Sequence, residues 1–91
     1  MEVKMDAIIE ILEKYRKIFL KLKKNKNHSS FDKFKKKLIN ELKSKNSKSY
    51  LSDEINKFIS DIESADDFYT ILGLIDSLKS FIYNQEHIYK M

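Results

Sequence analysis

VKMDAIIEILEKYRKIFLKLKK, residues 3–24, places apolar side chains at alternating spacings of three and four residues. This spacing returns each of them to one face of an α-helix, so the stretch predicts an amphipathic helix. The pairs Glu10–Lys14 and Glu13–Lys17 lie four residues apart on the polar face, in the order that favours a helix. The apolar stripe consists of Met5, Ile8, Leu12, Tyr15, Phe19 and Leu22.

Three further stretches show helical periodicity, each with a residue near its start that is suited to cap a helix. The expected caps are Ser29 with Asp32, Ser52, and Ser64 with Asp67. The 91 residues include no proline and one glycine, so few residues interrupt helices. We therefore predict one all-α domain over residues 1–91, an antiparallel four-helix bundle with helices near 3–24, 30–44, 52–63 and 65–87.

The stretch 65–87 is the most apolar of the four, which predicts that this helix lies at the centre of the bundle. Gly73 interrupts it at a cost of about 1 kcal/mol relative to alanine. Two explanations are open: another helix approaches closely at Gly73, which we favour, or the helix bends there.

Chemical motifs are scarce in this chain. Without cysteine it has neither disulfides nor thiolate chemistry, and its two histidines, His28 and His87, have no neighbour suited to orient a general base. Asp66 and Asp67 are expected to compensate a helix dipole. No glycine-rich phosphate loop or metal-ligand spacing is present, so we expect a protein that is not an enzyme and uses no metal or cofactor. The cysteine-free composition, the lack of a leader-like segment and the short apolar runs favour a cytoplasmic protein without a membrane span.

Charge divides along the chain: residues 1–48 carry a net charge of +9 and residues 49–91 carry −5. Lysine supplies 17 of the 18 cations, and Arg16 is the one arginine. A lysine-rich helix is either a solvated surface or a phosphate-binding surface for nucleic acid. The candidates for phosphate contacts are Lys33, Lys35, Lys36 and Lys37.

The chain has eleven aromatic residues, five Tyr and six Phe. Tyr69, Tyr83 and Tyr89 fall outside the main apolar stripe of residues 65–87, where they either bind a partner or cover the ends of the bundle. We expect a non-catalytic protein-binding module. The alternatives are a small basic nucleic-acid-binding protein and a self-assembling protein that forms homodimers through its C-terminal helix.

The small size, the positive net charge, the expected cytosolic location and the four-helix pattern resemble the pediocin-like bacteriocin immunity proteins. The most local similarity is Ser52-Asp53-Glu54 leading into the apolar stripe Ile55, Phe58, Ile59 and Ile62. The resemblance implies an immunity or inhibitor protein that neutralises a bacteriocin or toxin through protein contacts. In that family a flexible tail follows the corresponding helix, whereas a long apolar segment follows from Ala65 here, so no functional residue is carried over.

Overall fold

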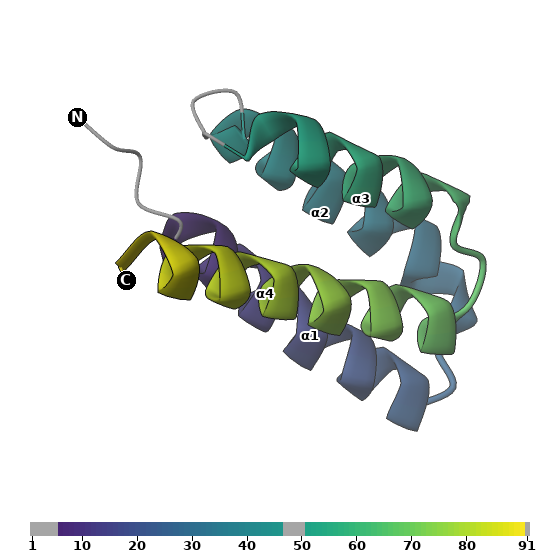
Figure 1. Cartoon of the computed structure of the whole chain (residues 1–91). Coiled ribbons are helices and arrows are strands. Elements are labelled where there is room, and N and C mark those ends of the chain that lie inside the picture. Colours follow the sequence, from purple (N-terminus) through teal and green to yellow (C-terminus); the bar gives the residue numbers. More distant parts are fainter. Residues whose placement is uncertain (1–5, 47–50, 91) are drawn as a thin grey trace.

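The computed structural model describes residues 6–46 and 51–90, with side chains described up to residue 85. It contains four α-helices, α1 (Asp6–Lys24), α2 (Phe31–Asn46), α3 (Ser52–Ser64) and α4 (Phe68–Lys90), and a short 3₁₀ helix, η1 (His28–Ser30). Figure 1 shows α1 beside α4 in one layer and α2 beside α3 in the other. The described residues form no strand, so the prediction of an all-α four-helix bundle is confirmed.

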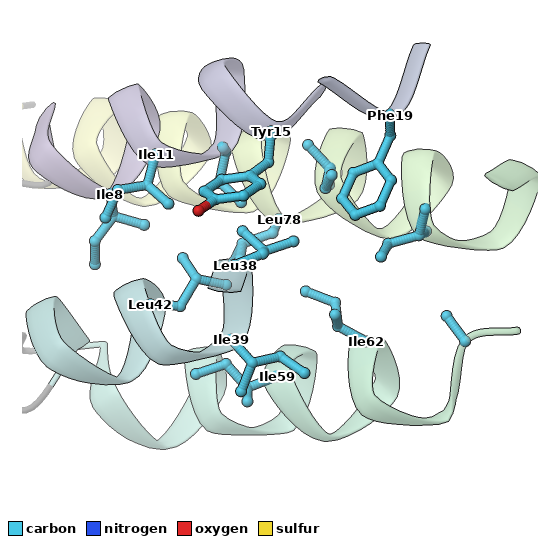
Figure 2. Packing of buried hydrophobic residues seen from close by; sticks show 14 of the residues in the cluster. Ile8, Ile11, Tyr15, Phe19, Leu38, Ile39, Leu42, Ile59, Ile62 and Leu78 are labelled. Carbon is cyan, nitrogen blue, oxygen red and sulfur yellow. The ribbon is translucent and has the colours of Figure 1, made fainter. Parts of the chain in front are cut away.

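One continuous hydrophobic core joins the four helices (Figure 2). Phe19 of α1, Leu38 of α2, Ile62 of α3 and Ile75 of α4 are each 0% exposed. Full burial of such a side chain is worth about 2 kcal/mol, which is a large amount for a bundle of this size. The apolar stripes identified in the sequence therefore face one another.

A compact turn connects α1 to α2. Lys26 adopts the left-handed conformation with φ of 56°. The amide of Asn27 then donates to the carbonyl of Leu22 at 2.8 Å, and that of Lys26 to Lys23 at 3.1 Å, the two hydrogen bonds of a Schellman motif. The Asn27 side chain accepts from the amide of Ser30 and the hydroxyl of Ser29. The prediction that Ser29 caps this segment is therefore wrong, because the Schellman turn brings Asn27 into the capping position.

The predicted caps of α3 and α4 are also wrong. Ser52 lies within the first turn of α3, which is preceded by Leu51. At α4, Ala65 is extended with φ −71° and ψ 131°, and the helix begins at Phe68, three residues later than expected. The cap is Asp67, whose carboxylate accepts from the Thr70 amide at 2.7 Å. This hydrogen bond lowers the pKa of Asp67 and agrees with its expected role at a helix dipole.

The position of α4 corrects two further expectations. One stripe of α4 is buried, while Tyr69 and Gly73 on its other side are exposed, so α4 is one wall of the bundle and not its centre. A Cβ atom added to Gly73 would meet no atom within 4 Å. Close approach of another helix at Gly73, the favoured explanation, is therefore wrong, and α4 continues through this residue as one helix.

Ion pairs cross the boundaries between helices. The Lys14 Nζ atom lies 2.8 Å from Glu41 of α2, and Lys43 lies 3.6 Å from Glu63 of α3. Between α1 and α4, Arg16 pairs with Asp76 at 2.8 Å and Glu13 with Lys79 at 3.8 Å. Lys14 and Glu13 thus pair with other helices and not with the residues four positions away.

Candidate protein interface on α1 and α4

Two ion pairs show which residues of α1 and α4 meet at the outer surface of the bundle. Arg16 Nε donates to Asp76 Oδ1, and Glu13 approaches Lys79 about one helical turn away. Tyr69 and Tyr83 lie seven residues before and after Asp76, which places both on the same side of α4. Leu20 lies four residues after Arg16 and therefore on the α4 side of α1. We call this surface the α1/α4 face: Glu13, Arg16, Leu20, Lys23, Tyr69, Leu72, Gly73, Asp76, Lys79 and Tyr83.

The α1/α4 face holds all three of the large hydrophobic side chains that are exposed in the described part of the chain. Tyr69 is 76% exposed, Tyr83 50% and Leu20 39%. The Lys23 Nζ atom lies 3.8 Å from the centroid of the Tyr69 ring, in cation–π contact. The exposed apolar surface of the described chain is therefore concentrated on one face of the bundle, spread over about 20 Å along α4.

The charges of this face are already paired with one another. Arg16 with Asp76 and Glu13 with Lys79 leave Lys23 as the one cation outside an ion pair, and it lies over a tyrosine ring. Tyrosine and arginine are the residue types most enriched where binding energy concentrates in protein interfaces. The face therefore combines exposed aromatic area with little net charge.

Sequence analysis found part of this face. Tyr69 and Tyr83, two of the predicted partner-binding residues, share it, whereas the side chain of Tyr89 lies outside the described residues. Leu20 and Arg16 were not predicted. Both lie on the first helix, and nothing in its own periodicity shows that they meet the tyrosines of α4.

The four lysines predicted to bind phosphates do not share one surface. Lys35 turns towards the end of α3, where its Nζ atom donates to the carbonyls of Glu63 at 3.0 Å and Ala65 at 2.9 Å. Lys33 and Lys37 lie on the α1 side of α2, within 5.7 Å and 5.4 Å of the Phe34 ring. Lys36, about 100° further round the helix from Lys37, is exposed.

Two titratable groups with shifted pKa values, Tyr15 and Glu41, lie between α1 and α2. The Tyr15 hydroxyl donates to Glu41, and Lys14 holds both oxygens of the same carboxylate at 2.8 and 3.0 Å. Hydrogen bonds from Lys14 and Tyr15 lower the pKa of Glu41, while burial, together with the Glu41 carboxylate, raises the pKa of Tyr15. Both shifts keep each group in its resting protonation state, which suits a structural link between helices better than proton transfer.

An open cavity of about 370 Å³ adjoins this link, and it is lined by two opposite pairs of charges, Glu10, Lys14, Glu41 and Lys45. No group of three or more metal-ligating side chains occurs among the described residues. His28 is exposed, with its ring centroid 5.2 Å from that of Phe68. His87 lies where side chains are not described.

Comparisons with protein-family models, curated proteins and solved structures found no match to this chain. Within the described ranges, no helix has the length and apolar character needed to cross a membrane. The functional argument therefore depends on the surfaces of the bundle.

Proposed function

We propose that this chain is a non-catalytic protein-binding module whose partner docks on the α1/α4 face. One observation carries the proposal: the exposed large hydrophobic side chains Leu20, Tyr69 and Tyr83 lie along one face of the bundle, with Tyr69 and Tyr83 about two helical turns on either side of the Arg16–Asp76 pair. Covering this face removes aromatic and aliphatic surface from water. Because Arg16 and Asp76 already form a pair, docking does not leave either charge without a partner.

A more specific form of this proposal is an immunity or inhibitor protein that neutralises a bacteriocin or toxin. It is supported by the resemblance to the pediocin-like immunity proteins and by the four-helix architecture. Such a protein acts by occupying a surface of its target, and a rigid helical face with two exposed tyrosines suits that role.

The test begins with a photo-crosslinking residue placed at Tyr69 in the native host, followed by purification of the captured protein. Its affinity is then measured for the wild-type chain and for the double variant Tyr69→Ser/Tyr83→Ser. Loss of two anchoring tyrosines is expected to weaken binding by at least about 30-fold. The matched control is Lys57→Ser/Asp61→Ser, which changes two exposed residues of α3 and should leave affinity unchanged.

Three results contradict the proposal. In the first, the captured protein binds the tyrosine variant as tightly as it binds the wild type. In the second, the chain turns over a small substrate in the absence of any partner. The third is a concentration-dependent dimer in sedimentation that the tyrosine substitutions dissociate, which assigns the face to a second copy of the chain.

A further inference from the structure

Four exposed lysines lie on the outer sides of the neighbouring helices α1 and α2. Because Lys14 pairs with Glu41, these two residues lie at about the same height along the axes of α1 and α2. Since a helix rises about 1.5 Å per residue, Lys17 and Lys21 lie about 4 and 10 Å further along α1. On the antiparallel α2, Lys37 and Lys33 lie about 6 and 12 Å away in the same direction. The four lysines therefore occupy one stretch of this pair of helices, about 4 to 12 Å from the Lys14–Glu41 ion pair, and we call them the lysine cluster: Lys17, Lys21, Lys33 and Lys37.

The cluster surrounds a half-buried apolar centre. Ile18 and Phe34 lie between the two rows of lysines and pack against the core. The Nζ atoms of Lys33 and Lys37 lie 5.7 and 5.4 Å from the Phe34 ring centroid, so the ring helps to hold both ammonium groups on this surface. All four lysines are exposed, and none forms an ion pair among the described residues. The charge of Lys37 adds to the hydrogen bonds from Lys14 and Tyr15 in lowering the pKa of Glu41.

This arrangement departs from the way charge is placed elsewhere in the bundle. The other end of the same boundary balances Glu10 and Glu41 against Lys14 and Lys45. The α1/α4 and α2/α3 boundaries also carry ion pairs. Charges of one sign gathered on one surface repel each other, and positions that break a rule kept elsewhere in the molecule are where function is expected.

From this geometry we infer that the lysine cluster binds the phosphodiester backbone of nucleic acid without reading its sequence. Ammonium groups act as point charges for phosphates, whereas base recognition depends largely on arginine or on amide side chains. Phe34 is half-buried, so its faces are not free to stack on bases. The cluster therefore has the chemistry for affinity and lacks that for specificity.

An anionic membrane is the competing target for four lysines. Binding at a membrane surface also requires apolar side chains that insert among the lipids. Of the three exposed large hydrophobic residues in the described chain, Tyr69 and Tyr83 lie on α4, and Leu20 is the one near the cluster, three residues from Lys17. A single leucine provides little apolar surface for insertion. This inference concerns a different boundary from the proposed protein interface and stands or falls separately from it.

The experiment measures binding of a fluorescent, mixed-sequence DNA duplex by anisotropy as salt is raised. Four phosphate contacts predict a slope of log affinity against log salt of about −3.6, a loss of roughly 100-fold between about 50 and 200 mM. For Lys33→Glu/Lys37→Glu the magnitude of this slope should decrease to less than about 2. The same decrease is expected for Lys17→Glu/Lys21→Glu. The control Lys36→Glu/Lys57→Glu makes an equal change in net charge at other exposed positions and should keep most of the affinity.

Circular dichroism checks that each variant remains helical. Because the cluster is tested by two independent double variants, the misfolding of one of them does not decide the result. Absence of duplex binding at low salt overturns the inference. So does an equal loss of affinity in the control, because general net charge would then explain binding. Preference for phosphatidylserine vesicles over the duplex, with the same dependence on the cluster, assigns the surface to a membrane and also overturns it.

Discussion

Lys26 occupies a backbone conformation that normally suits glycine. Its φ of 56° places a side chain in the left-handed region, at a cost of roughly 1 to 2 kcal/mol. The Schellman hydrogen bonds of Lys26 and Asn27 to the last turn of α1 require this conformation. The turn is thus a site of local strain that the surrounding hydrogen bonds maintain.

Lys26→Gly is therefore expected to raise the free energy of unfolding by about 1 kcal/mol, measured by urea denaturation. The matched control is Lys24→Gly, two residues earlier within α1, which should lower stability by about 1 kcal/mol. If both substitutions destabilise the protein to the same extent, the left-handed turn is not the source of strain.

Gly73 is the opposite case, a glycine in ordinary helical conformation with open space around it. Gly73→Ala should raise the free energy of unfolding by about 0.5 to 1 kcal/mol, because alanine loses less backbone entropy and meets no neighbour. Ser80→Gly, on the same exposed side of α4, should lower it by a similar amount. Destabilisation by Gly73→Ala would show that some group does pack against this residue.

Glu41 makes stability depend on pH in the acid range. Its pKa is lowered on folding, so the native state binds fewer protons than the unfolded state, and this contribution is present above the ordinary pKa of 4.5. It is lost as pH falls through the lower folded value. Thermal unfolding of Glu41→Gln should therefore change less between neutral pH and about pH 3 than that of the wild type. Parallel pH profiles for the two proteins would contradict this linkage.

At the scale of the helices, α2 and α3 are joined by a side chain that serves as a cap. The last turn of a helix leaves carbonyls without intrahelical donors. Lys35 reaches from α2 to donate to the carbonyls of Glu63 and Ala65, where α3 ends and the chain turns towards α4. A residue predicted as a phosphate contact thereby closes the α3–α4 connection.

Lys35→Met keeps most of the aliphatic stem of Lys35 and removes the ammonium donor. We expect a loss of about 1 kcal/mol in the free energy of unfolding, because two carbonyls lose a charged donor. Lys36→Met, the adjacent exposed position, should change stability by less than about 0.5 kcal/mol. Equal effects of the two substitutions would remove the capping role of Lys35.

The predictability of these elements has a physical basis. Apolar periodicity predicted four helices and five of their eight bounds to within two residues, because a helix is a local structure with a fixed repeat. Helix caps were less predictable. Ser64 and Asp67 are both chemically suited to cap α4, and the extended backbone at Ala65 places the start of the helix after Asp67. The α1/α4 face was half predictable: its tyrosines stand out on one helix, whereas Leu20 joins them only through the packing of two helices.

On the scale of the whole molecule, stability depends on one core of modest size. Figure 2 shows Leu38 pointing from α2 into the middle of the buried cluster, towards α1 and α4. It is 0% exposed, whereas Leu74 is only partly buried at the edge of the same cluster. Every helix contributes to the space around this central position.

Leu38→Ala should lower the free energy of unfolding by about 2 to 5 kcal/mol, a large fraction of the roughly 5 kcal/mol expected for so small a domain. Leu74→Ala should cost less than half as much, because solvent and side-chain movement fill its site. Calorimetry of both variants measures the difference. Similar losses would indicate that Leu74 is as deeply packed as Leu38.

The turn between α1 and α2 also bears on the order in which the bundle assembles. Its hydrogen bonds connect residues between Lys21 and Ser30, so the two helices meet after closure of a very short loop. Short loops cost little entropy to close, and contacts between neighbours in sequence form early in folding. The α1–α2 hairpin is therefore expected to form earlier than the packing of α4 against α1, where Arg16 and Asp76 are separated by 60 residues in the sequence. In that order the lysine cluster is assembled before the α1/α4 face exists.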